Sequence, residues 1–327
     1  MKKKFSLGKL LVILALLVYS VFLLFPIFTV LITSFTPTEE LAGSTEFIWW
    51  PENFTFDAYK AIFEYDFYAD LTGMPGLVLG LVNTMWLTLV PLVIGLFVSG
   101  FSAYAFSKMD FPFKEQLFRF SVIIRSIPLG AFSVISYVFY SAIGWTGDKG
   151  FLPLLIPGMF GSLGTLFFLR LFFDGIPNSL IEAAMLDGAG FLQCFTKIMF
   201  PLAKPAFIAQ FIFGFVAGYN SYLAPQLYLQ DQPQFVTLQL YLSQIRELFP
   251  GLGNENIHMA AAILGMLPLV IIYCCLQNTL LKVLPKAALR NKWRYFNEEN
   301  TNYSIAFDHN TALVLHASYR LYAQAAV

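Results

Sequence analysis

Long apolar runs are the feature that most restricts what this chain can fold into. An α-helix rises about 1.5 Å per residue, so roughly 20 apolar residues are needed to cross the hydrocarbon core of a bilayer. Lipid offers no hydrogen bonds to the backbone, so a run of that length must form a helix. The sequence therefore predicts an all-α membrane protein with six transmembrane helices, at about residues 8–34, 77–106, 117–143, 151–173, 205–227 and 258–284.

The composition argues against a soluble protein. Only 12% of the 327 residues are charged, whereas soluble domains carry about a quarter. The first apolar run extends from about Gly8 to Phe35, which is too long for a signal peptide, and no small-residue cleavage site follows it. We therefore interpret it as a retained first span. The cysteines match neither a disulfide framework nor a metal site.

The basic residues fall mainly on one side of the predicted topology. The side richer in lysine and arginine is cytoplasmic by the positive-inside rule, so we expect both termini in the cytoplasm. The opposite loops contain only Lys60, Lys149 and Arg246. We expect residues 1–285 to form the membrane domain and the polar residues 286–327 a cytoplasmic tail. The basic residues on the cytoplasmic side are Lys2, Lys3, Lys4, Lys9, Lys108, Lys114, Arg119, Arg170, Lys197, Lys204 and those from Lys282 to Arg294.

The segment between the fourth and fifth spans, residues 174–204, has the pattern of a helix–turn–helix outside the membrane. Pro177 and the polar residues after it are typical of a helix N-terminus. Gly188 is expected to break this helix, and Pro201 and Pro205 to end the second helical piece before span five. A short helix with a face of small residues suits a contact in which a helix lies in a groove of another protein.

This segment resembles the EAA coupling loop in the permeases of binding-protein-dependent ABC importers, whose pattern is E-A-A-x3-G-x9-I-x-L-P. Phe200 stands where the pattern has leucine. Asp187 beside Gly188 is similar to the Asp-Gly pair of the carbohydrate-importer branch, which includes the maltose-type permeases. The residues that match the pattern at the family spacing are Glu182, Ala183, Ala184, Gly188, Ile198 and Pro201.

The resemblance extends over roughly residues 5–284, including Asn83-Thr84, Ser102–Ala105 and Gly218–Pro225. It implies a type I ABC importer permease fold in a bacterial cell membrane, with the helix around Glu182 in a groove of an ATPase subunit. The implied partners are a second, non-identical permease subunit, two ATPase subunits, an extracellular solute-binding protein and membrane lipid, and no nucleic acid. Since the chain has no G-x-x-x-x-G-K-[ST] phosphate loop, we expect ATP and Mg²⁺ on the ATPase subunits and no cofactor or metal in this chain.

Polar side chains inside the predicted spans are the candidates for the solute path, because polar groups are costly in lipid. Asn and Tyr can hydrogen bond to sugar hydroxyls, and aromatic rings can stack on sugar rings. Hydrogen bonds between helices account for most of these residues equally well. For the arginine among them, snorkelling to the cytoplasm, lining the path and pairing with a partner subunit all stay open. The candidates are Tyr219, Asn220, Tyr222, Gln226, Asn83 and Arg125.

Other classes of membrane protein fit the sequence less well. A membrane enzyme would need catalytic groups, but the chain has only three histidines and no paired carboxylates within its spans, so we expect no catalytic residues. Secondary transporters and channels usually carry ionisable relays, which are almost absent here apart from Arg125. The resemblance therefore implies a non-catalytic permease for an oligosaccharide or other carbohydrate, with a secondary transporter or channel as a less favoured alternative. A permease of the same type for a non-sugar solute is the main alternative.

Overall fold

The computed structural model describes residues 7–44, 46–64, 67–127, 132–229, 232–251 and 253–298, and within these ranges the side chains of residues 10–277. The chain divides into two units, Met1–Leu280 and Leu281–Val327, and the features below belong to the first. Most of the predicted tail, residues 299–327, lies outside the described residues. The predicted boundary at residue 285 stays a prediction.

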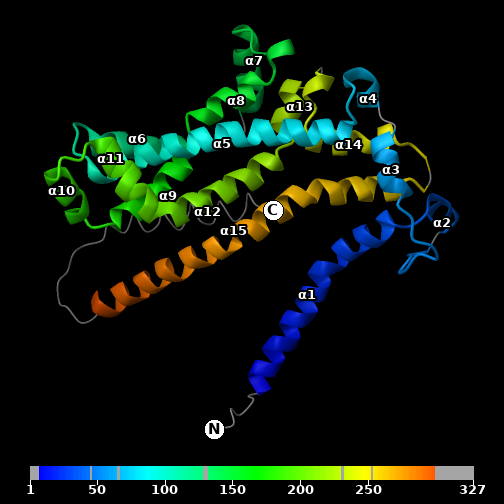
Figure 1. Ribbon diagram of the computed structural model, residues 1–327, viewed down its shortest axis with the longest axis horizontal. Coiled ribbons are helices and arrows are strands. Elements are labelled where there is room, and N and C mark those ends of the chain that lie inside the picture. Colours follow the sequence, from blue (N-terminus) through cyan, green and yellow to red (C-terminus); the bar gives the residue numbers. More distant parts are fainter. Residues whose placement is uncertain are drawn as a thin grey trace. The chain divides into compact units, whose positions relative to one another are not determined.

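Every regular element in the described residues is a helix, as the sequence predicts (Figure 1). Short 3-10 turns occur at Gly147–Lys149 and Pro233–Phe235, and a π-helical turn occurs at Phe195–Met199. The α-helices are α1 Leu7–Ser34, α2 Thr38–Gly43, α3 Asp57–Glu64, α4 Phe67–Thr72, α5 Gly76–Lys108, α6 Lys114–Arg125, α7 Ser133–Ala142, α8 Leu152–Met159, α9 Leu163–Asp174, α10 Ser179–Leu186, α11 Phe191–Cys194, α12 Phe200–Tyr219, α13 Leu223–Leu229, α14 Leu238–Leu248 and α15 Glu255–Glu298.

Five segments of the described chain are long and apolar enough to cross a membrane. The predicted third span, 117–143, is instead divided between α6 and α7, with residues 128–131 outside the described part. The predicted count of six spans therefore stays a prediction. The five segments are Leu10–Ser34, Gly76–Lys108, Gly147–Asp174, Phe191–Tyr219 and Glu255–Gln277.

The fifth predicted span, 205–227, differs most from the observed helix. The helical segment begins earlier, at Phe191, and α12 ends at Tyr219. Asn220 is the C-cap residue of α12, and its side-chain amide donates to the Val216 carbonyl at 3.0 Å. The chain turns there and starts a separate short helix, α13, so the apolar pattern continues across a break that hydropathy alone does not detect.

Helix α5 packs against α8, α9, α12 and α14 (Figure 1). Its glycines allow this close packing: a Cβ atom on Gly95 would overlap the carbonyl oxygen of Gly158, and one on Gly80 would lie 3.1 Å from the Leu238 Cα. Small residues at helix contacts are typical of membrane proteins, where van der Waals packing drives helix association.

Two apolar cores form at opposite ends of α5. The first joins the N-terminal half of α5 to α12, α14 and α15, with Phe215, Tyr219 and Tyr241 almost fully buried. The second joins the C-terminal half of α5 to α9, α10, α11 and the start of α12, with Tyr104 and Phe173 almost fully buried. Both ends of α5 are therefore fixed within the protein.

Helix α1 is exposed along most of its described length and is held by its C-terminal end. The Ser34 hydroxyl lies 2.8 Å from the Tyr59 hydroxyl of α3, and the Asn256 amide donates to the Thr36 carbonyl at 2.9 Å. The exposed side chains of α1 are apolar, which suits contact with lipid or with another membrane subunit.

Asn83 and Thr84 of α5 hold the segment that links α13 to α14. The Asn83 amide donates to the carbonyls of Gln234 and Val236, at 3.0 and 2.9 Å, and its oxygen accepts from the Trp86 indole. The Thr84 hydroxyl accepts from the Leu238 backbone amide at 2.8 Å. Asn83 is 5% exposed, so these bonds are shielded from water.

Replacing Asn83 with leucine is expected to lower the free energy of unfolding by about 2–4 kcal/mol, because two buried carbonyls and the indole N–H lose their partner. Asn220→Ala is the control, since that exposed side chain bonds mainly within its own helix. Chemical denaturation in mixed micelles measures both variants. Equal losses for the two would contradict a clamping role for Asn83.

Candidate functional site

The predicted coupling helix is α10, and a lysine from α5 holds its start. The Lys108 ammonium group donates to the Ile176 carbonyl at 2.6 Å and to the Asn178 side-chain oxygen at 2.7 Å. The helix begins at Ser179, as the proline and asparagine before it predict, but Asn178 makes no side-chain cap to the backbone. Its oxygen accepts from Lys108 instead, which ties the start of α10 to the end of α5.

Aromatic stacking fixes the other side of the coupling segment to α5. Tyr104 stacks on Phe191 of α11 with ring centroids 4.6 Å apart, and Phe101 stacks on Phe195 at 4.1 Å. Phe101, Tyr104 and Lys108 share one face of α5 because three- and four-residue spacings bring side chains together on a helix. One face of α5 therefore carries both contacts to the coupling segment.

Gly188 makes the turn between α10 and α11. Its φ is +84°, in the left-handed region that favours glycine. The Gly188 amide donates to the Met185 carbonyl at 3.0 Å, and the Ala189 amide to the Ala184 carbonyl at 2.9 Å. This is the sharp turn that the sequence predicts at Gly188.

The prediction that Pro201 and Pro205 end the second helical piece is wrong. The helical path runs from Phe191 through a π-helical turn at Phe195–Met199 into α12, in which both prolines lie. In the π turn the Phe200 amide donates to the Phe195 carbonyl, five residues back. Pro201 occupies the first turn of α12, where a missing N–H is tolerated, and the wider π turn takes up the local change of register.

The outer face of α10 is apolar and exposed. Ile181 is buried and anchors the helix, whereas Leu180, Met185 and Leu186 are 45%, 51% and 89% exposed. The predicted coupling residues Glu182, Ala183, Asp187 and Gly188 are exposed, Ala184 is partly buried, and further along the chain Ile198 is partly buried and Pro201 exposed. The structure thus places most of these residues on one surface, at the end of the molecule where α5 ends.

A polar cluster beside this surface was not found from the sequence. Arg170 of α9 lies 3.5 Å from Glu115 and 3.7 Å from Asp174, and its guanidinium group lies over the Phe118 ring at 3.8 Å. The Ser107 hydroxyl donates to Asp174 at 2.6 Å. The cluster joins α5, α6 and α9 next to the start of α10. Its members are distant in sequence, so their pairing could not be deduced without the fold.

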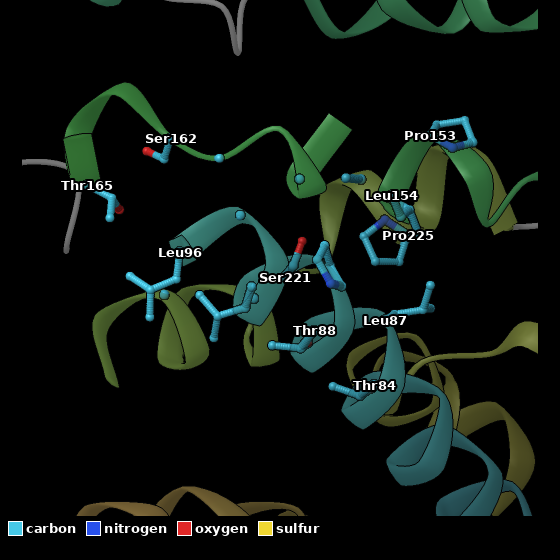
Figure 2. A pocket seen from close by; sticks show the side chains of 18 of the residues that line it. Thr84, Leu87, Thr88, Leu96, Pro153, Leu154, Ser162, Thr165, Ser221 and Pro225 are labelled. Atoms are coloured by element: carbon cyan, nitrogen blue, oxygen red, sulfur yellow. The ribbon is translucent and has the colours of Figure 1, made fainter. Parts of the chain in front are cut away.

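The described residues enclose a first cavity of about 420 Å³, the α5–α8 cavity. Figure 2 shows residues of α5, α8, α9 and the α12–α13 break around it. Its wall is mainly small and apolar, and four of its hydroxyl groups are bonded within the protein. The residues that line it are Thr84, Leu87, Thr88, Pro91, Leu92, Gly95, Leu96, Ser99, Pro153, Leu154, Gly158, Gly161, Ser162, Thr165, Gly214, Gly218, Ser221, Ala224, Pro225 and Thr237.

A second cavity, of about 700 Å³, lies at the N-terminal end of α5 and is more polar. We call it the glutamine cavity, because three glutamines line it. Helices α4, α13 and α14 and the link between α13 and α14 form its wall. The residues that line it are Phe67, Tyr68, Tyr222, Gln226, Leu229, Gln232, Pro233, Val236, Leu240, Ser243, Gln244, Glu247 and Leu248.

The link that Asn83 and Thr84 hold lies between the two cavities. Val236 lines the glutamine cavity, and the next residue, Thr237, lines the α5–α8 cavity. Their extended backbone turns successive side chains to opposite sides. The clamp on this link therefore keeps the two cavities apart.

The residues predicted for the solute path lie in several different surroundings. Tyr222 and Gln226 line the glutamine cavity. Tyr219 donates to the Gly265 carbonyl at 2.7 Å and Asn83 holds the α13–α14 link, so both make contacts between elements. Asn220 is exposed at the end of α12.

Arg125 lies outside the linings of both cavities. Its guanidinium group lies against Gly164 of α9, where a Cβ atom would come within 2.8 Å of it. Among the described residues, no group of His, Cys, Asp and Glu could hold a metal ion.

Comparison with known proteins identifies the family. Residues 94–282, more than half of the chain, match the model of the family described as binding-protein-dependent transport system inner membrane component. The chain belongs to this family. It is therefore the membrane component of a binding-protein-dependent ABC importer. In such importers the ATPase is a separate subunit and a binding protein supplies the solute, as predicted.

Named relatives and a solved structure agree with this assignment. An arabinooligosaccharide transport permease of Bacillus subtilis is 28% identical over 277 residues, covering 84% of this chain and 93% of the relative. A polygalacturonan/rhamnogalacturonan transport permease of the same organism is 26% identical over 276 residues, covering 80% and 91%.

A bacterial ABC transporter involved in the import of the acidic polysaccharide alginate shares the fold of this permease. The TM-score is 0.71 at 20% identity, with 84% of this chain and 98% of that chain covered. The predicted all-α importer-permease fold and the inner-membrane location are confirmed. The positions of the termini stay a prediction.

Gly188→Ala is expected to strain the α10–α11 turn by about 1–2 kcal/mol, because an L side chain is disfavoured in the left-handed region. The backbone amides of residues 188 and 189 should exchange their hydrogens faster in the variant than in the wild-type permease, and hydrogen-exchange measurements check this. Gly190→Ala is the matched control: Gly190 has φ −75° and open space around it, so exchange should not change. Similar exchange in both variants would contradict the turn geometry.

Lys108→Met is expected to loosen the start of α10, because the Ile176 carbonyl and the Asn178 side chain lose their donor. A spin label on a cysteine at Ala183 should become more mobile, after Cys274 and Cys275, both exposed, are replaced by serine. Arg119→Met is the control, since this exposed cation makes no contact among the described residues. Unchanged label mobility in Lys108→Met would show that the lysine does not hold the helix.

Proposed function

We propose that this permease pairs with a second, non-identical permease subunit and carries an oligosaccharide or other carbohydrate, driven through α10 by two ATPase subunits. ATP and Mg²⁺ bind to those ATPase subunits. The observation that carries the coupling role is the exposed outer face of α10, on a helix whose base is fixed to α5.

The geometry of α10 suits transmission of force. Leu186 and Met185 offer an apolar contact for a groove, and Glu182 offers a carboxylate for a basic group on the ATPase subunit. The contacts of Lys108, Tyr104 and Phe101 then pass a displacement of α10 to α5. Because α5 lines the α5–α8 cavity directly and holds the α13–α14 link through Asn83 and Thr84, its displacement moves the first cavity's wall and the link that also lines the glutamine cavity.

A carbohydrate solute is supported by the relatives and by the cavities. Relatives with similar coverage are named for arabinooligosaccharides, maltodextrin and diacetylchitobiose. The glutamine cavity combines amide groups with aromatic rings, the groups that bind sugar hydroxyls and sugar faces. Tyr222 and Gln226 are the path residues that this arrangement supports most directly.

The proposal is tested with the importer reconstituted in lipid vesicles together with its ATPase subunits and binding protein. ATP is supplied on the side of the vesicle membrane that carries the ATPase subunits, and labelled sugars are supplied with the binding protein on the opposite side. The labelled sugars are maltotriose, arabinotriose, diacetylchitobiose and trigalacturonate. ATP-dependent uptake of at least one sugar is expected. Uptake of none of these, while amino acids or other non-sugar solutes enter, would overturn the carbohydrate assignment.

Glu182→Lys is expected to reduce ATP-driven uptake by at least about tenfold, since a charge that pairs with a basic group now repels it. The protein should still insert and fold, because Glu182 is exposed and makes no contact among the described residues. Glu64→Lys makes the same charge change at the other end of the molecule and should leave uptake intact. Normal uptake and normal ATPase assembly in Glu182→Lys would contradict the coupling role.

A further inference from the structure

The glutamine cavity is lined by polar side chains whose hydrogen-bonding groups are not used within the described part of the protein. The hydroxyl of Tyr222, the amide of Gln226 and the carboxylate of Glu247 have no partner among the described side chains. Tyr222 and Gln226 are half-buried and Glu247 is exposed at the rim, so a ligand or water in the cavity can supply the partners that these groups lack within the protein.

Gln244 is oriented for a ligand rather than merely exposed. The Tyr68 hydroxyl donates to its side-chain oxygen at 2.6 Å, which fixes the amide plane. The Nε2 group of Gln244 makes no bond to the described part of the chain and is left as a donor. A preset amide loses little side-chain freedom when it binds, so its hydrogen bond contributes more to affinity.

An aromatic surface completes the cavity. The Phe67 ring is 55% exposed and lies edge-on to Tyr68, with ring centroids 5.4 Å apart. Exposed aromatic rings beside amide donors suit a ligand that has an apolar face and a hydroxyl rim, as a pyranose or furanose ring does. A volume of about 700 Å³ is within the range of small-ligand sites.

The charge of the cavity restricts which sugars fit. Glu247 is its one charged lining residue, and no Lys, Arg or His lines it in the part of the chain that the structure describes. A uronate carries a negative charge on each sugar unit at neutral pH, and the exposed Glu247 carboxylate at the cavity rim repels a like charge. Carboxylate recognition normally uses arginine, which is lacking here.

From these observations we propose that the glutamine cavity binds one or more uncharged sugar units on the solute path and that Glu247 disfavours uronate oligosaccharides. Gln226 and Gln244 donate to sugar hydroxyls, Glu247 accepts from them, and Phe67 packs on a ring face. This inference rests on the proposed carbohydrate function and narrows it to neutral sugars.

The test uses the complex of both permeases and the ATPase subunits, purified without the binding protein and placed in lipid nanodiscs. Equilibrium dialysis measures its binding of labelled maltotriose, arabinotriose, diacetylchitobiose and trigalacturonate. At least one neutral probe should bind about tenfold or more tightly than trigalacturonate, a difference of the size that one or two good contacts give. Trigalacturonate binding equal to or tighter than every neutral probe would overturn the proposal.

Substitutions in the glutamine cavity test whether the measured sugar binding occurs there rather than at another site of the complex. Gln226→Met and Gln244→Met keep the side-chain length and should each weaken neutral-sugar binding about tenfold. Gln239→Met is the matched control, since Gln239 is on α14 but contacts Asn220 and does not line the cavity. Affinities of both cavity variants equal to that of the control would overturn the proposal.

Glu247→Lys tests whether the negative charge of Glu247 disfavours uronates, because reversing that charge should strengthen the binding of a uronate. The side chain is exposed, so the variant should fold and assemble even if a glutamine variant does not. The affinity for trigalacturonate should rise by about tenfold, and an unchanged ratio of neutral-sugar to trigalacturonate affinity would overturn the role of Glu247.

The inference and the proposed function fail in different ways. If wild-type vesicles transport a sugar and all cavity variants bind sugars with wild-type affinity, this inference alone is refuted. Wild-type vesicles that transport no sugar would refute the proposed carbohydrate function.

Discussion

The close packing of α5 against its neighbours is the constraint on which the rest of the structure depends. A membrane protein gains little from hiding apolar side chains, because lipid already surrounds them, so helices associate through close contact and through hydrogen bonds. Glycines at Gly80 and Gly95 bring the backbone of α5 against the start of α14 and the α8–α9 turn. Hydrogen bonds at Asn83 and Lys108 then fix its two ends. A single helix thereby joins the start of α10 at one end to the α13–α14 link, which lines the glutamine cavity, at the other.

The sequence predicts the class of fold well because its determinants are local. Run length indicates most of the long apolar helices, and the E-A-A-x3-G spacing locates helix α10 to within a few residues. Gly188 is a case where one residue type and one backbone conformation correspond directly. These features need no knowledge of distant contacts.

Contacts between distant segments account for what the sequence could not supply. The sequence left open whether Tyr219 and Asn83 contact the solute or bond between helices, and the structure shows that both donate to carbonyls, on α15 and on the α13–α14 link. Apolar composition also hides the break at Asn220, because most residues of α13 are apolar, as those of α12 are. Pro201 would be expected to end a helix of regular α geometry. Here the π turn just before it changes the local geometry, so the helical path continues through the proline. The row Phe101, Tyr104 and Lys108 is a helical-face pattern that could have been found beforehand.

The exposed leucine at the end of α10 has a consequence for how the transporter is made. Leu186 is 89% exposed, beside the exposed Met185, and the proposed coupling role places both in water rather than in lipid. A copy of this permease synthesised before its ATPase partners thus presents an uncovered hydrophobic site of the kind that chaperones and proteases recognise. In the proposed coupling, docking of the ATPase covers that site. The same contact would then couple survival of the membrane subunit to the supply of its soluble partners and keep their amounts in balance.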